Sequence, residues 1–168
     1  IVYPMNALAN SQYDEFAARL HSSGLKIALY TGDTKNSQKE AIASHFALTG
    51  RKEPYDSELL SREEIKATPP DILLTNYVML EYILTRFEDK EIFPAENMGV
   101  LRFLVLDEVH TYTGKQGADV AYLIRRLKQH TGTAGELLCI GTSATVQSTE
   151  GEDASTAISA FATRLFGE

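Results

Sequence analysis

The chain has 168 residues and carries 23 acidic against 16 basic side chains, a formal net charge of -7 at pH 7. Its single cysteine, Cys139, cannot form an internal disulfide, and no apolar run approaches the roughly 18 residues of a membrane-spanning helix, so neither a disulfide-stapled module nor a transmembrane helix is predicted. The acidic balance also argues against a free-standing nucleic-acid-binding domain, because such domains usually present a basic face.

Short apolar runs predict five strands, and segments with helical spacing lie between them. Most of the runs are continuously apolar, which is typical of strands buried on both faces of a helix-covered parallel sheet. The alternation of strands and helices predicts an α/β fold, a three-layer domain with a mainly parallel central sheet and right-handed crossovers. The predicted strands are residues 1–3, 25–30, 71–75, 101–106 and 137–141.

The helices are predicted from apolar spacing and from capping residues. Ser61 and Glu64 form a capping-box pattern for a short helix, and Asn76 can cap the helix after the third strand. The charge-rich, proline-containing stretch 51–70 predicts a surface excursion, and residues 150–155 predict a polar loop. The other helices are expected around residues 13–20, 36–48, 120–127 and 158–166.

The chain opens with Ile1 rather than methionine, and this residue already belongs to a predicted strand. We therefore expect a fragment or a trimmed form of a longer protein. The first residues lack the basic head and long apolar stretch of a signal peptide, and we expect a cytoplasmic protein.

Two adjacent carboxylates, Asp107 and Glu108, follow the most apolar predicted strand. Charges at the end of a buried strand are costly unless something neutralises or uses them, and Mg²⁺ is a natural partner because it takes oxygen ligands and keeps several waters. Adjacent residues of an extended chain point to opposite sides, so one carboxylate can face the metal while the other faces a reacting phosphate, with His110 nearby. The simpler alternative is a solvated pair that only begins a loop.

A hydroxyl-rich loop, Thr142-Ser143-Ala144-Thr145, follows the last predicted strand. Ligands of parallel α/β sheets bind beyond the carboxyl ends of the strands, so these hydroxyls are placed to bond to His110 or to the carboxylates. Alone, the loop is only a turn signal.

Taken together, these segments resemble the motifs of a known family. The sequence is similar to the first RecA-like domain of superfamily 2 helicases of the DExH type, a DEAD/DEAH-box-like group. The matching segments are Pro-Met-Asn-Ala-Leu-Ala-Asn-Ser-Gln at 4–12 (motif Ia), a glycine-containing turn at 30–33, Thr-Asn-Tyr-Val-Met-Leu at 75–80 (motif Ib), Asp-Glu-Val-His at 107–110 (motif II) and Ser-Ala-Thr at 143–145 (motif III). Residues 107–126, with His-Thr-Tyr-x-Gly after the acidic pair, look most like bacterial DNA helicases of the repair and phage-defence type.

The resemblance implies a P-loop, Gly-x-x-x-x-Gly-Lys-Ser/Thr, ahead of motif Ia, and the sequence has none. Gly114-Lys115 is not one, because Val109 stands where the first glycine should be and Gln116 follows the lysine. We therefore expect residues 1–168 to be a partial ATP-binding domain that lacks motif I and the second RecA-like domain. A degenerate ATPase that has lost its P-loop is the rival interpretation.

The resemblance also implies roles for the residues around motifs II and III. Asp107 is expected to hold Mg²⁺, mainly through water, and Glu108 to orient and activate the hydrolytic water. His110 is expected to couple the nucleotide site to Ser143 and Thr145.

A second group of residues is expected to lie along a nucleic-acid strand and to contact its phosphates through backbone amides and short polar groups. Asn76 has the simpler role of a helix cap as its alternative. A basic run on a predicted helix is expected to form a solvated face, and three histidines without ligand spacing are expected at the surface. The residues expected to contact the nucleic acid are Asn6, Ala7, Thr75 and Asn76. The basic run consists of Arg125, Arg126 and Lys128, and the three histidines are His21, His45 and His130.

The leading hypothesis is a fragment of an ATP-dependent helicase or translocase that uses ATP and Mg²⁺. Its expected partners are DNA, with RNA as the alternative strand, and the second RecA-like domain of the same chain; the isolated fragment is expected to be inactive. An alternative is a non-catalytic, P-loop-less binding module that pairs with a partner motor. A third is a metal-dependent phosphohydrolase using Asp107, Glu108 and His110, for which Asp33 is the one obvious further ligand.

Overall fold

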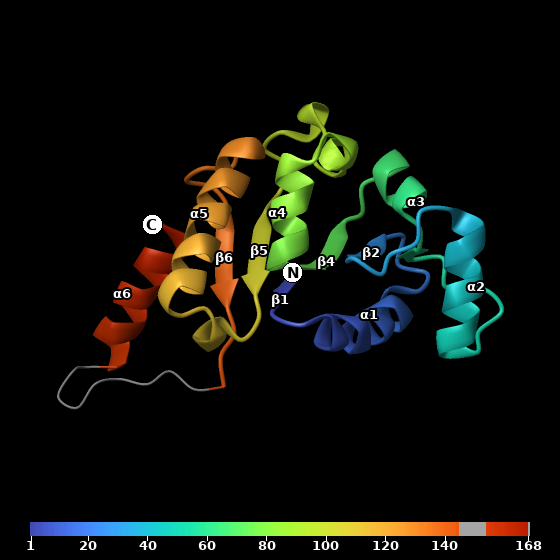
Figure 1. The fold of residues 1–168 in the computed structure, drawn as a ribbon, viewed down its shortest axis with the longest axis horizontal. Coiled ribbons are helices and arrows are strands. Elements are labelled where there is room, and N and C mark those ends of the chain that lie inside the picture. The colour runs from blue at the N-terminus through green and yellow to red at the C-terminus, as the bar shows by residue number, and fades with distance from the viewer. Residues whose placement is uncertain (145–153, 168) are drawn as a thin grey trace. The chain divides into compact units, whose positions relative to one another are not determined.

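The computed structural model describes residues 1–144 and 154–167 and shows an α/β fold with a six-stranded sheet (Figure 1). The strand order is β3-β2-β4-β1-β5-β6, and the β1–β5, β2–β3, β2–β4 and β5–β6 pairs are all parallel. The predicted fold class, an α/β domain with a mainly parallel sheet, is confirmed. The strands are β1 (Val2–Tyr3), β2 (Ile27–Tyr30), β3 (Glu58–Leu59), β4 (Ile72–Asn76), β5 (Phe103–Leu106) and β6 (Leu138–Gly141).

The helices follow the predicted order, and the caps of α3 and α4 are those that the sequence indicated. The Ser61 side chain and Glu64 form a reciprocal capping box, and the Asn76 side chain accepts the amide of Met79 at 2.7 Å. Within the described residues, no helix is both long and apolar enough to cross a membrane. The helices are α1 (Asn6–Leu20), α2 (Gln38–Thr49), α3 (Arg62–Ala67), α4 (Tyr77–Thr85), α5 (Gly114–His130) and α6 (Ala154–Phe166), with 3-10 turns η1 (Phe87–Ile92), η2 (Ala95–Asn97) and η3 (Val109–Thr111).

The stretch 51–70, predicted as a surface excursion, contains a strand that the sequence did not indicate. Two residues, Glu58 and Leu59, pair in parallel with Ile27 and Ala28 of β2. The strand is short and begins with a charged residue, so it carries no apolar run. The predicted polar loop at 150–155 falls mostly outside the described residues, and α6 already includes its last two positions.

The chain divides into two compact units, and the first comprises Ile1 and Tyr3–Phe93. Its buried residues form two clusters. Ile27 of β2 belongs to one cluster and the next residue, Ala28, to the other, so both faces of this strand are covered, as predicted. One cluster joins α1 to the sheet through Tyr3, Ala9, Tyr13, Ala17, Ile27 and Leu74. The other joins α3, α4 and η1 to it through Ala28, Tyr30, Ile65, Met79, Ile83 and Ile92.

The second unit comprises Val2 and the chain from Pro94 onward. The predicted apolar face of α5 is buried, through Val120, Leu123, Ile124 and Leu127. Leu104 and Leu106 of β5 are buried as well, whereas the alternate residue Phe103 is 59% exposed.

The opposite face of β5 and β6 departs from the prediction that both faces of the strands are covered. Phe103 is the register partner of Leu138, which is 60% exposed, and Ile140 on the same face of β6 is exposed as well. Residues two apart on a strand share a face, so these side chains form an exposed apolar surface. We refer to Phe103, Leu138 and Ile140 as the open face.

Part of the basic run on α5 is not the solvated face that the sequence suggested. Lys128 is buried, and its ammonium donates to the carbonyl of Phe166 at 2.9 Å. Arg125 and Arg126 are exposed, as predicted, and Arg125 donates to the carbonyl of Arg164 at 3.2 Å. Lys128 and Arg125 thus satisfy carbonyls at the end of α6, where positive charge is favourable.

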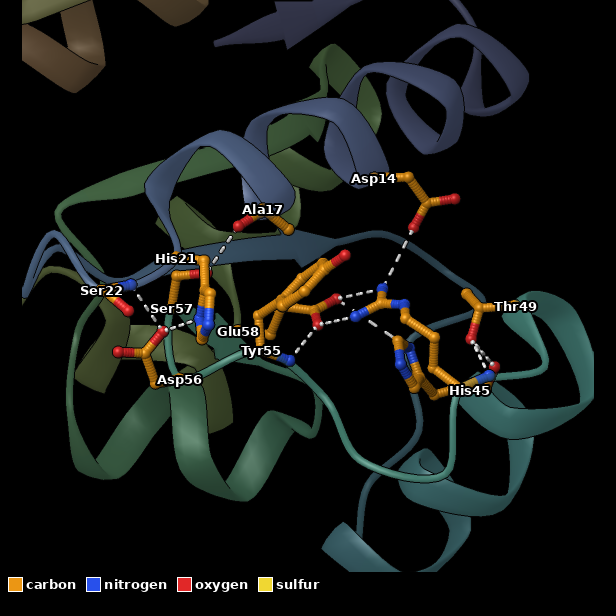
Figure 2. Close-up of polar contacts among 11 residues, drawn as sticks. Asp14, Ala17, His21, Ser22, His45, Thr49, Tyr55, Asp56, Ser57 and Glu58 are labelled. Atoms are coloured by element: carbon orange, nitrogen blue, oxygen red, sulfur yellow. Dashed lines mark hydrogen bonds and ion pairs between the residues drawn. The ribbon is translucent and has the colours of Figure 1, made fainter.

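A buried ion pair anchors β3 in the first unit (Figure 2). The Glu58 side chain is 0% exposed, and the Arg51 guanidinium donates to its two oxygens at 2.9 and 3.3 Å. The Tyr55 amide donates to the same carboxylate at 2.7 Å. His45, predicted at the surface, is buried, with Nδ1 3.9 Å from Glu58. Bonding to Glu58 holds the pKa of Arg51 above its ordinary value.

Candidate nucleotide and nucleic-acid sites

Asp107 and Glu108 lie where β5 ends, and Glu108 has an unusual backbone. Its φ of 51° and ψ of 50° are left-handed, and Ser22 is the only other non-glycine residue with positive φ among those described. Such a conformation costs about 1–3 kcal/mol in a non-glycine residue, and residues held in it cluster at active sites, ligand clamps and switch regions. The strain therefore falls on the residue to which the family resemblance assigns activation of the water.

The loop after β6 contacts this turn through main chain and side chain. The Thr142 hydroxyl donates to Oδ1 of Asp107 and accepts the amide of Glu108 at 3.3 Å. The Thr142 carbonyl accepts the amide of Val109 at 2.9 Å, and its own amide donates to Leu106 at 3.0 Å. The expectation that this hydroxyl-rich loop bonds to the carboxylates is met at Asp107.

His110 lies between the two loops. Its Nδ1 is 3.1 Å from the Ser143 hydroxyl, the contact that the sequence suggested. The same nitrogen is 3.1 Å from Oε2 of Glu108, in a geometry that gives an ion pair when the ring is protonated but is not a hydrogen bond. Thr145, the other predicted coupling residue, lies outside the described residues.

The donor set of this turn fits a magnesium ion held largely through water. Oε2 of Glu108 is buried and has no hydrogen-bond partner among the described residues, so it is an acceptor available to a water or a ligand. No group of three or more His, Cys, Asp or Glu within the described parts of the chain forms a metal cage. Asp107 alone would hold the ion, which suits Mg²⁺ because it commonly binds through one or two carboxylates, waters and substrate phosphates.

In the first unit, the residues predicted to contact nucleic acid lie at the ends of β1 and β4, where the following helices begin. The Asn76 side chain donates through Nδ2 to the side-chain Oδ1 of Asn6 at 2.6 Å, and Nδ2 of Asn6 donates to Oδ2 of Asp33 at 3.5 Å. Asn6 begins α1, and Asn76 caps α4. The contact thus ties the N-termini of two helices together.

These two N-termini differ from those of α2 and α3. The first turns of α1 and α4 contain no acidic residue, whereas α2 has Glu40 and α3 has Glu63 and Glu64 there. No side chain of the described residues caps α1, and Ala7 in its first turn is exposed. Free amides and the positive end of the helix dipole attract anions, so this end of α1 is suited to a phosphate.

Thr75 has a structural use for its side chain. It is buried, and its hydroxyl donates to the carbonyl of Tyr30 at 2.7 Å, which joins the ends of β2 and β4. Its amide donates to Ile1 at 3.0 Å.

Arg62 is a residue of this region that the motif analysis missed. Its guanidinium donates to the carbonyls of Thr31 and Thr34 at 3.0 and 2.9 Å and lies 4.9 Å from the centre of the Tyr30 ring. It thereby holds the turn that carries Asp33. Its position beside the capping residue Ser61 was the only local signal. An open pocket of ≈570 Å³ adjoins the turn, lined by Gly32, Asp33, Thr34, Lys35, Asn36, Glu40, Arg62, Lys66 and Glu88.

The predicted site residues thus fall into two groups. Asp107, Glu108, His110 and Ser143 come together in the second unit, and Asn6, Ala7, Thr75 and Asn76 lie in the first.

The chain is similar in sequence and in fold to known proteins. The chain is 40% identical over 124 residues to the Druantia protein DruE of Escherichia coli, a match that covers 69% of this chain and 7% of DruE. It is 31% identical over 127 residues to the uncharacterized ATP-dependent helicase MJ1574 of Methanocaldococcus jannaschii, covering 76% of this chain and 16% of that protein. Among solved structures, the DUF1998 helicase MrfA bound to DNA and AMPPNP matches with a TM-score of 0.63 and 26% identity, over 99% of this chain and 19% of MrfA.

The chain therefore spans less than a fifth of the length of each of these relatives. A family model described as DEAD/DEAH box helicase matches residues 1–153. These residues include the turn at Asp107 and Glu108, which we call the acidic turn, and the loop after β6 that contacts it. This chain belongs to the DEAD/DEAH box helicase family.

Proposed function

We propose that the longer protein containing this chain is an ATP-dependent helicase or translocase, and that this chain supplies the turn that activates the hydrolytic water. The observation that carries the proposal is Glu108, which combines a left-handed backbone with a buried carboxylate oxygen that accepts no hydrogen bond from the described residues. The phosphate-binding loop and the second RecA-like domain are assigned to other parts of the longer protein, which we place in the cytoplasm.

In this proposal, Glu108 orients the attacking water and takes its proton, and Asp107 holds Mg²⁺ through water. When bound, ATP would supply the phosphoryl group, and Mg²⁺ would neutralise the charge on its phosphates. His110 senses the site through its contacts with Glu108 and Ser143, both at 3.1 Å. Hydrolysis at the turn of Asp107 and Glu108 is thereby linked to the position of the loop after β6.

The test is ATP turnover by the full-length protein carrying Glu108→Gln, with Glu53→Gln at an exposed position as the matched control. Loss of a positioned general base typically lowers the rate by about 10²–10⁴-fold, so we expect a fall in kcat of that order and wild-type turnover in the control. Unchanged turnover in Glu108→Gln would refute the assignment. A full-length wild-type protein that never hydrolyses ATP would instead support the non-catalytic binding module.

We further propose that the N-termini of α1 and α4 contact the phosphates of a nucleic-acid strand, DNA in the first instance. The exposed Ala7, the uncapped start of α1 and the Asn6–Asn76 hydrogen bond support this placement. A similar helicase, MrfA, has been solved bound to DNA. Such contacts follow the nucleic-acid backbone without reading its sequence. Because they use backbone amides and short polar groups rather than basic side chains, they are compatible with an acidic chain.

The matched pair Ala7→Glu and Ala7→Gln tests this placement in the full-length protein. Glutamate in a first helical turn is compatible with the helix dipole, so the fold should tolerate it, but its charge repels a phosphate. We expect Ala7→Glu to weaken single-stranded DNA binding by about 1 kcal/mol, or roughly fivefold, relative to Ala7→Gln at low salt. Equal affinities for the two variants would show that α1 does not contact the nucleic acid. Tighter binding of RNA than of DNA would identify RNA as the bound nucleic acid.

A further inference from the structure

Thr142 is the first residue after β6, and its side chain makes contacts with both members of the acidic pair. The hydroxyl donates its one proton to Oδ1 of Asp107 and accepts the amide of Glu108 at 3.3 Å. A hydroxyl has one hydrogen and two acceptor sites, so both contacts can exist at once. A valine of the same shape could make neither.

The left-handed turn at Glu108 needs such support. A strained backbone persists only where its surroundings fix it. On one side, the Glu108 carbonyl accepts the amide and hydroxyl of Thr111 at 2.9 and 2.8 Å. On the other side, the Glu108 amide has the Thr142 hydroxyl as its partner.

The main chain holds Thr142 itself in place. Its amide donates to Leu106, and its carbonyl accepts the amide of Val109. A Cβ added at Gly141 would lie 3.0 Å from a methyl carbon of Val109, which shows how closely β6 approaches the turn. The hydroxyl is therefore presented from a fixed backbone.

We propose that Thr142 is a positioning residue that orients Asp107 and keeps Glu108 in its left-handed conformation. The inference rests on the proposed function and deepens it, because it adds a hydroxyl outside Ser143 and Thr145 through which the loop after β6 acts on the acidic turn. Displacement of this loop would move both carboxylates together.

The test compares Thr142→Val with Thr142→Ser in the full-length protein. Thr131→Val is the matched control, because the Thr131 hydroxyl is buried and bonds to Leu127 and Thr133 instead. The measurements are kcat and KM for ATP, and the affinity for Mn²⁺, detected by electron paramagnetic resonance in the presence of a non-hydrolysable ATP analogue.

Loss of a group that orients a metal-binding side chain typically costs 10–100-fold in metal affinity or activity. We expect Thr142→Val to lose about that factor in kcat and in Mn²⁺ affinity, with little change in KM, and Thr142→Ser to stay within about threefold of wild type. Thr131→Val should leave both quantities unchanged even where it lowers Tm.

Wild-type kcat and Mn²⁺ affinity in Thr142→Val would overturn the inference, as would a Thr142→Ser variant that is as impaired as Thr142→Val. If Thr142→Val does not fold, Thr142→Ala replaces it in the comparison with Thr142→Ser; failure of both to fold would show a structural role and contradict positioning. Full turnover in Glu108→Gln refutes the proposed function, whereas loss of turnover there with normal Thr142→Val refutes only this inference.

Discussion

Replacing Arg51 with methionine should destabilise the chain severely, because it leaves the buried carboxylate of Glu58 without its cation. Glu58 is 0% exposed at its side chain and would lose two charge-assisted hydrogen bonds, at 2.9 and 3.3 Å (Figure 2). Of its described hydrogen bonds, that from the Tyr55 amide would remain. The carboxylate would then stay buried and largely uncompensated.

The expected loss follows from this geometry. Breaking a buried ion pair by removing one partner costs about 3–5 kcal/mol. Arg51 is 25% exposed, so water already shares its charge, and the lower end, about 3 kcal/mol, is the appropriate value. For a chain of this size that corresponds to a fall in Tm of roughly 6–12 °C.

The assay is urea unfolding followed by circular dichroism, with Lys52→Met as a control at the exposed neighbouring position. The double variant Arg51→Met/Glu58→Leu should recover most of the loss, because replacing both members of a buried pair with apolar groups is often neutral or stabilising. A loss below about 1 kcal/mol for Arg51→Met, or a double variant less stable than the single one, would refute the reasoning.

Two further outcomes can be measured on the same chain. Gly117→Ala should lower Tm, because the added Cβ would lie 2.5 Å from the carbonyl oxygen of Tyr112 and the main chain must shift, at roughly 1–3 kcal/mol; a higher Tm, the usual result in an exposed helix, would contradict this contact. The Ser22 amide and then His21 hold the pKa of Asp56 below its ordinary value of 3.8. Since the folded pKa lies below the unfolded one, this contribution is complete above the unfolded value and is lost as the pH falls through the folded one. Urea midpoints between about pH 5 and pH 2 should therefore fall more steeply in wild type than in Asp56→Asn, and parallel curves would exclude the linkage.

Local chemistry made much of the fold predictable. The capping box at Ser61 and Glu64 and the cap at Asn76 depend on residues three positions apart, so the sequence alone indicates them. The apolar face of α5 is equally local, because helical spacing places its members together. At the acidic turn, the sequence indicated which residues follow the strand and that the neighbouring loop carries hydroxyls.

The missed features depend on contacts between residues distant in sequence. Nothing local shows that Glu58 is buried in a strand, because that strand forms only by pairing with Ile27 and Ala28 of β2. Lys128 is interpreted as a surface lysine until Phe166 brings a helix end to it. The left-handed backbone of Glu108 has no signature in its residue type, since glycine, not glutamate, normally marks such a position.

The open face has a consequence for handling the chain in solution. Phe103, Leu138 and Ile140 present apolar side chains to water, and β6 is the last strand in the sheet order, with a row of backbone groups along its outer edge. Apolar surface next to a strand edge promotes association between copies, which the net charge of -7 opposes only where salt does not screen it. The colloidal behaviour of the isolated chain should therefore depend on ionic strength: dispersed in dilute buffer, and increasingly aggregated as salt is added.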